Sequence, residues 1–153
     1  IDVSHITDPG FWDVLEVSRD TVIASHSNCR ALCSTMRNLP DDIIKALAEK
    51  GGVIGMNYGQ GFLINRNEII SGKTPTVETV VDHIDHIVGV TGSVDNIGLG
   101  SDFDGVPSVA QGLEDVSKLP NLTKTLVARS YSDQEIERIL GANFLRVIRK
   151  VWK

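Results

Sequence analysis

The sequence has little cysteine and no long apolar run, and each shortage excludes a class of protein. Cys29 and Cys33 are its two cysteines, too few for a disulfide framework and without the second pair of a zinc knuckle, so we expect two reduced thiols. No stretch of eighteen uncharged apolar residues occurs, which predicts no membrane span. The opening residues, IDVSHITDPG, show neither the basic region nor the cleavage site of a signal peptide.

Positive charge is scarce and scattered along the chain. Fifteen Lys and Arg residues stand against 20 Asp and Glu residues, which gives a net charge of −5 and a pI near 5.3. Without a basic cluster, a surface that follows nucleic-acid phosphates is not expected. At 153 residues and 41% hydrophobic content, the composition predicts one globular, soluble domain.

Short apolar runs that end in polar residues predict four strands. They are apolar throughout rather than alternating, which favours parallel strands covered on both faces. The predicted strands cover residues 1–5, 21–26, 52–57 and 96–102. The first run, residues 1–5, resembles the end of a buried strand whose earlier residues are not in the sequence, so we expect the chain to start inside a fold.

Apolar residues at helical spacing predict a helix after each strand. The last of these helices follows a capping box, Ser132 with Glu135. The predicted helices cover residues 11–17, 40–50, 76–90 and 132–151, and the weakly patterned stretch 105–129 is expected to be a loop with short helical pieces. This alternation predicts an α/β fold, either an open doubly wound sheet or a (βα)8 barrel, of which four units are half.

Polar residues at the strand ends predict a site, because chemistry gathers at the carboxyl ends of parallel strands. They are His5, His26, Asn57, Asp102 and Asp104. Two imidazoles at the ends of consecutive strands can share a zinc ion, and a carboxylate on a later strand can move a proton to a leaving amine. A hydrogen-bonded structural role is the alternative for each histidine.

Several other residues are open to two interpretations. Of the two carboxylates near the fourth strand, Asp102 is nearer the strand end and is the better candidate than Asp104. Arg37 can clamp an anionic group bidentately or form a structural salt bridge. His83 and His86 lie three apart among the apolar residues of a predicted helix, so we interpret both as structural or surface residues.

Seven stretches together resemble the renal or membrane dipeptidase family of zinc peptidases, over essentially the whole chain. The spacing of 21 residues between His5 and His26 also agrees with that family. The matching stretches are IDVSH (1–5), FWDVL (11–15), VIASHSN (22–28), RNLPDD (37–42), DHIDHI (82–87), GSDFDGV (100–106) and GANFLR (141–146).

The resemblance implies a (βα)8 barrel of which residues 1–153 are the carboxy-terminal half. It implies two zinc ions, bridged by a glutamate and by the water that attacks, and hydrolysis of dipeptides with a free amino end. On that model His5 and His26 are ligands of the second zinc. Asp102 contacts the substrate amino group and transfers protons, and Arg37 holds the substrate carboxylate.

The family's His-x-Asp pair, bridging glutamate and further pocket histidine belong upstream of residue 1. We therefore expect an amino-terminal half of the barrel, as a second chain or a missing segment; a homodimer is a further possible assembly. Two alternatives stay open: a catalytically inactive half-barrel that serves as a binding or assembly module, and a different metal-dependent amidohydrolase acting on lactams or acyl-amino acids. Because no hydrophobic tail follows Trp152, a cytoplasmic location is expected rather than a membrane anchor.

Overall fold

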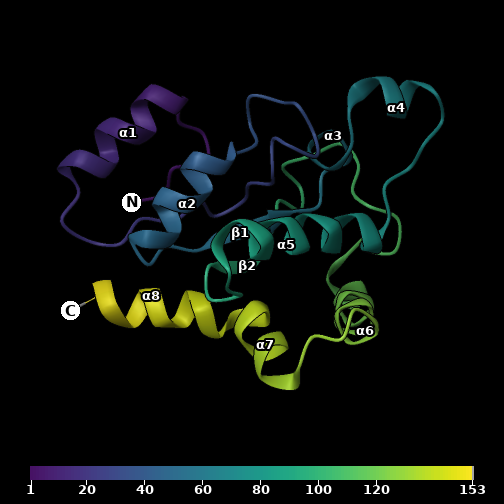
Figure 1. Cartoon of the computed structure of the whole chain (residues 1–153). Coiled ribbons are helices and arrows are strands. Elements are labelled where there is room, and N and C mark those ends of the chain that lie inside the picture. Colours follow the sequence, from purple (N-terminus) through teal and green to yellow (C-terminus); the bar gives the residue numbers. More distant parts are fainter. Residues whose placement is uncertain (153) are drawn as a thin grey trace.

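The computed structural model describes residues 1–152, and the predicted unit 1–153 extends one residue beyond them. Helices dominate it, and Figure 1 shows how they surround two short strands. The elements in chain order are α1 (Asp8–Val17), α2 (Asp41–Glu49), β1 (Ile54–Asn57), α3 (Gln60–Leu63), α4 (Arg66–Ile70), α5 (Val77–Thr91), β2 (Ile97–Ser101), the 3₁₀ turn η1 (Val116–Lys118), α6 (Leu119–Ala128), α7 (Asp133–Glu137), the π-helical turn η2 (Arg138–Ala142) and α8 (Asn143–Val151).

The sheet of the described residues has two parallel strands, where the sequence predicts four. β1 and β2 pair from Ile54 opposite Ile97 onward. The first two predicted strands are instead extended segments held by single parallel bridges, Asp2 to Ile23 and Ala24 to Ile54. The predicted α/β class and the parallel order are therefore confirmed, and the prediction of four regular strands is wrong.

Side chains take over where the backbone ladder between the first two segments ends, after the bonds from the Val3 N–H to the Ile23 carbonyl and from the Ile23 N–H to the Ile1 carbonyl. The Asp2 carboxylate accepts the Ser25 backbone N–H at 2.9 Å, and the Ser4 hydroxyl accepts the His26 backbone N–H at 2.9 Å. Both donors would otherwise bond to carbonyl groups of a neighbouring strand. The two segments therefore lie side by side, but their outer residues are joined through side chains.

The predicted helices are present, with different ends. α1 begins at Asp8, because the Thr7 side chain caps it and a proline stands in its first turn. Ser132 and Glu135 form the predicted capping box of α7. The predicted helix 132–151 is broken by η2, where Gly141 leaves helical geometry, and 105–129 contains the ten-residue helix α6.

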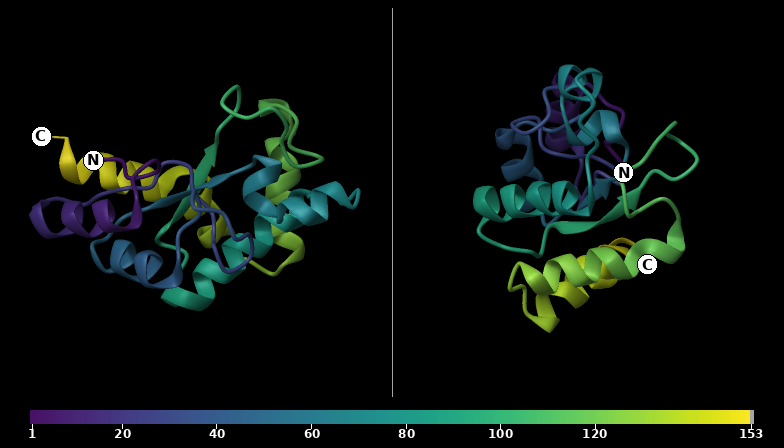
Figure 2. Two further views of the ribbon diagram at one scale, coloured as in Figure 1. Left: turned by 90° about the horizontal axis from the view of Figure 1, so that it is seen from above. Right: turned by 90° about the vertical axis from the view of Figure 1, so that its right-hand side faces the viewer.

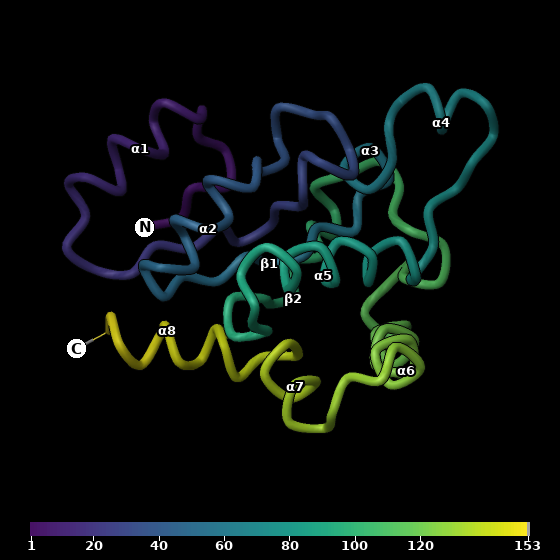
Figure 3. The backbone as a smooth tube through the Cα atoms, viewed as in Figure 1, coloured from purple at the N-terminus to yellow at the C-terminus, as the bar shows by residue number. Residues whose placement is uncertain are grey.

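The core lies where α5 meets the strands. Val80, Val81, Ile84 and Ile87 form the buried stripe of α5, and in Figure 1 this helix lies in front of β1 and β2, between α2 and α6. The carboxy-terminal helix α8 runs back toward the amino-terminal segment, so both ends of the chain lie on one side (Figures 2 and 3). No helix among residues 1–152 combines the length and apolarity that crossing a membrane requires.

Two glycines let three chain segments approach closely at the ends of the strands. A Cβ atom at Gly55 would lie 2.0 Å from the carbonyl oxygen of Ser25, and one at Gly100 would lie 2.1 Å from the same oxygen. No side chain fits at either position, so β1, β2 and the segment that carries Ser25 are in direct backbone contact.

The cysteines and the helical histidines have structural roles, as predicted. Cys29 and Cys33 are buried free thiols, and burial raises the pKa of Cys33 to about 11. His86 is half-buried and pairs with Asp41 of α2 at 2.8 Å. His83 is fully buried; its Nδ1 accepts the Cys29 N–H at 3.1 Å, so its Nε2 carries the proton and donates to the Leu63 carbonyl at 3.0 Å.

The buried His83 predicts a pH-dependent stability. Burial lowers its pKa from 6.5 to about 4, so below pH 6.5 the unfolded chain takes up a proton that the folded chain excludes. Stability is fully present above pH 6.5 and is lost progressively as the pH falls toward 4, by on the order of 3 kcal/mol. Urea unfolding from pH 7 to pH 4 should show that His83→Gln reduces this loss, whereas His86→Gln keeps it. Equal losses in both variants would contradict the assignment.

Candidate metal and substrate site

The two histidines predicted as metal ligands lie together. His5 follows the first extended segment and His26 follows the second, and their Nε2 atoms are 2.9 Å apart. Their ring centroids are 5.0 Å apart. The parallel arrangement of the two segments explains this, because it brings both strand ends to the same edge.

A hydrogen-bonded chain fixes the orientation of the His26 ring. The Ser25 hydroxyl lies 2.5 Å from Asp2 Oδ2 and 2.7 Å from His26 Nδ1. A carboxylate only accepts, so Ser25 donates to Asp2 and must accept from His26 Nδ1–H. Burial alone would raise the pKa of Asp2, but the hydrogen bonds from Ser25 and Ser4 lower it below its ordinary value, so Asp2 is an acceptor at neutral pH.

Arg37 lies beside the histidine pair. Its guanidinium donates to the Ser4 carbonyl and, at 3.1 Å, to His5 Nε2, and it stacks on the Phe62 ring. Burial lowers the pKa of Arg37, and the negative charges of Asp102 and Asp2 act against that shift. Arg37 is not part of a salt bridge within the described residues, but Asp102 is within electrostatic reach of its guanidinium.

Neither Nε2 atom of the pair carries a proton, because His26 donates through Nδ1 to Ser25 and His5 Nε2 accepts from Arg37. Each imidazole nitrogen has one lone pair, so a metal ion between the two nitrogens would take the place of the Arg37 N–H on His5. Two nitrogens on one tetrahedral zinc are about 3.3 Å apart, a few tenths of an ångström beyond their separation here, so the pair fits a metal. Among residues 1–152 no third His, Cys, Asp or Glu completes the ligand set.

Asp102 is placed by a break in the regular pairing of the strands. Met56 pairs with Leu99 but Asn57 pairs with Ser101, so β2 carries an extra residue there. Ser101 and Asp102 then adopt positive φ angles of 27° and 63°. Bulges and left-handed residues of this kind redirect side chains, and the Asp102 carboxylate turns back to accept a bond of 2.9 Å from Asn57 Nδ2.

Gly105 lies against the other oxygen of this carboxylate. A Cβ atom at Gly105 would be 2.1 Å from Asp102 Oδ1, and the Gly105 N–H donates to the Asp102 carbonyl at 3.1 Å. The carboxylate is therefore confined between the Asn57 amide and the Gly105 backbone.

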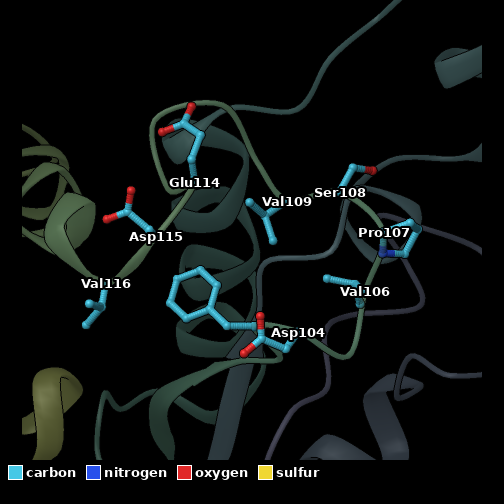
Figure 4. A pocket seen from close by; sticks show the side chains of 9 residues that line it. Asp104, Val106, Pro107, Ser108, Val109, Glu114, Asp115 and Val116 are labelled. Carbon is cyan, nitrogen blue, oxygen red and sulfur yellow. The ribbon is translucent and has the colours of Figure 1, made fainter.

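Asp104, the other carboxylate near the fourth predicted strand, lines a different part of the surface from Asp102. It is exposed and lines a cavity of about 460 Å³. Figure 4 shows Asp104, Glu114 and Asp115 around this cavity, which contains none of the four predicted site residues. The structure therefore brings His5, His26 and Arg37 into contact, places Asp102 within reach, and leaves Asp104 outside.

Two residues around the site lie outside the sequence prediction of site residues, and a third was predicted at a strand end without a role. Asp2 and Ser25 orient His26, and Asn57, the strand-end residue, bonds to Asp102. A signal was present for each: Asp2 is a charged residue inside an apolar run, Ser25 precedes a candidate ligand, and Asn57 ends a predicted strand. The residue types alone do not show which group each would contact.

A family model for membrane dipeptidase (peptidase family M19) matches residues 1–153. The chain belongs to the membrane dipeptidase family. Among its members, human Dipeptidase 3 is 42% identical over 153 residues, which are 100% of this chain and 30% of the human protein. The uncharacterised protein in the pqqA 5' region of Klebsiella pneumoniae is 39% identical, and the chain covers 55% of it. The chain thus spans about a third to about half of these relatives.

Solved structures agree with this family. A metallo peptidase of Rhodobacter sphaeroides, solved with a phosphinate mimic of the dipeptide L-Ala-D-Ala, superimposes with a TM-score of 0.88 at 32% identity, over 99% of this chain and 42% of that one. An amidohydrolase of Pseudomonas aeruginosa gives 0.86 at 26% identity, over 99% of this chain and 52% of that one. The site described above therefore lies on a metallopeptidase fold.

Gly105→Ala is expected to dislodge the Asp102 carboxylate. The new Cβ atom would occupy the place of Oδ1, and rotating the carboxylate away breaks its bond to Asn57, at a stability loss of about 1 kcal/mol. Gly61→Ala is the control, because a Cβ there meets nothing within 4 Å. Crystal structures and thermal unfolding of both variants check this; an unmoved Asp102 in the Gly105 variant would contradict it.

Proposed function

We propose that this chain supplies the carboxy-terminal half of the active site of a zinc-dependent dipeptidase. His5 and His26 bind zinc, Asp102 contacts the substrate amino group and transfers protons, and Arg37 binds the substrate carboxylate. The observation that carries the proposal is the convergence of two unprotonated imidazole nitrogens at 2.9 Å: His26 donates through its other nitrogen to Ser25, and His5 accepts from Arg37, whose N–H zinc would replace.

The chemistry follows from the groups that surround the pair. When bound, zinc polarises the scissile carbonyl and lowers the pKa of the attacking water. The Arg37 guanidinium can turn from the Ser4 carbonyl to a substrate carboxylate, which it matches bidentately. Asp102 is a hydrogen-bond acceptor within electrostatic reach of the guanidinium charge, suited to a substrate ammonium group and to carrying a proton to the leaving amine.

A half-barrel is supported by the order of the extended segments and by an uncovered apolar surface. Residues 1–3, residues 22–24, β1 and β2 follow one another side by side in parallel. An apolar groove of about 260 Å³ runs between Ile1, Ile23 and α8, where Trp152 is 77% exposed. The relatives carry additional chain that can cover such a surface and supply the remaining ligands.

Two alternatives predict different outcomes. The structural match to an amidohydrolase favours a second candidate function, hydrolysis of acyl-amino acids or lactams, which does not require a free amino group on the substrate. An inactive half-barrel that serves as an assembly module would bind the complementing segment without turnover.

Reconstitution tests the proposal. The chain would be co-expressed with the part of a family relative that precedes the aligned region, and native mass spectrometry would report both the complex and its zinc content. We expect one complex with about two zinc ions that cleaves L-Ala-D-Ala and leaves the N-acetylated dipeptide intact. Turnover of only the blocked substrate would favour the amidohydrolase, and a zinc-loaded complex without turnover would favour the module.

Ser25→Ala is expected to weaken zinc binding in this complex by about 10- to 100-fold, because it frees the His26 ring from the Asp2 carboxylate. Ser27→Ala is the matched control, since the buried Ser27 hydroxyl has no hydrogen-bond partner among the described residues. Competition titration with a zinc chelator measures both affinities. Equal affinities in the two variants would remove Asp2 and Ser25 from the site.

A further inference from the structure

Asn57 holds the carboxylate of Asp102 through an amide whose orientation the structure determines. Its Oδ1 accepts the Gly59 N–H at 2.7 Å, so its Nδ2 is the end that faces Asp102 Oδ2 at 2.9 Å. The side chain is 1% exposed. Water therefore does not compete for either bond, and the amide cannot turn around without leaving the Gly59 N–H unpaired.

The backbone of Asn57 is held equally firmly by a second buried asparagine. Asn28 Oδ1 accepts the Asn57 N–H at 3.0 Å, and Asn28 Nδ2 donates to the Asn57 carbonyl at 2.9 Å. Asn28 also donates to the Phe62 carbonyl at 3.1 Å, and His83 of α5 bonds to the adjacent Cys29 N–H. These hydrogen bonds, together with the covalent link between Asn28 and Cys29, join the core helix α5 to the end of β1.

The Asp102 backbone does not provide this orientation by itself. Asp102 and Ser101 have positive φ angles, a conformation that is unfavourable for non-glycine residues and persists only when other contacts stabilise it. Among the described residues, Asn57 is the side-chain donor to this carboxylate, and Gly105 closes the opposite side.

We propose that Asn57 is a positioning residue for the dipeptidase site, whose side-chain N–H sets the orientation of the Asp102 carboxylate toward the substrate amino group. The inference rests on the proposed function for the role of Asp102, and on the hydrogen bonds alone for the role of Asn57. An acceptor at position 57 cannot replace the amide, because two carboxylates at this separation repel each other.

The test exchanges the amide of Asn57 and the carboxylate of Asp102. Asn57→Asp should lower the Tm of the chain by about 3 °C or more, because it juxtaposes two carboxylates. The double variant Asn57→Asp with Asp102→Asn should restore most of that loss, because one donor again faces one acceptor. This thermal measurement needs only the chain itself, and failure of the double variant to recover would overturn the positioning role.

Measuring kcat distinguishes a loss of Asp102 positioning from a general loss of protein stability. In the reconstituted zinc complex, Asn57→Asp should lower kcat by about 10- to 100-fold with unchanged zinc content, and the double variant should stay inactive although its Tm recovers. Asn38→Ala is the matched control. Asn38 is equally buried and donates to the Cys33 and Phe62 carbonyls but makes no bond to Asp102, so it should lower Tm and leave the kcat of folded complex unchanged.

The two proposals fail in different ways. An Asp102→Asn complex that retains full dipeptidase activity would refute the proposed role of Asp102 in the reaction, while thermal recovery in the double variant would still establish the contact with Asn57. An Asn57→Asp complex with the kcat of the parent would refute the positioning role while leaving the dipeptidase assignment intact.

Discussion

The Asp2 carboxylate is the group on which the geometry of the histidine pair depends. It accepts backbone N–H bonds from Ser4 and Ser25 and the hydroxyl bond from Ser25, so one side chain both joins the first two extended segments and orients His26. These bonds lie next to the backbone bonds between the two segments, from the Val3 N–H to the Ile23 carbonyl and from the Ile23 N–H to the Ile1 carbonyl. The end of the ladder is thus made by a side chain that also fixes an imidazole.

Buried amides perform the equivalent task on the other side of the site. Asn28 and Asn57 are almost fully buried and make their hydrogen bonds to backbone carbonyls, backbone N–H groups or Asp102. Such networks are favourable only when nearly every member is satisfied, and they then specify one arrangement of the loops. Together with the Asn28–Cys29 backbone they connect neutral, buried His83 to Asp102, so the edge that carries Asp102 is tied to the core without a buried charge.

The sequence predicted the placement of polar side chains better than the regularity of structure. Polar residues after apolar runs placed His5, His26 and Asp102 at strand ends, and capping residues such as Ser132 located helices. The single bridges at Asp2 and the bulge before Asp102 depend on contacts between distant segments, which a local pattern does not contain. Helix α6 was missed because its buried positions, Leu122 and Leu126, are too few to produce a clear periodicity.

The close approach of Gly55 and Gly100 to one carbonyl has a consequence for protein engineering. The backbones of both glycines contact the carbonyl oxygen of Ser25, the residue before His26. Main-chain contacts therefore set the position of the His26 imidazole relative to the sheet. Transplanting the histidines alone onto another α/β scaffold would therefore not reproduce the site. A successful graft would have to carry both glycines with it, although neither has a side chain that could touch a substrate.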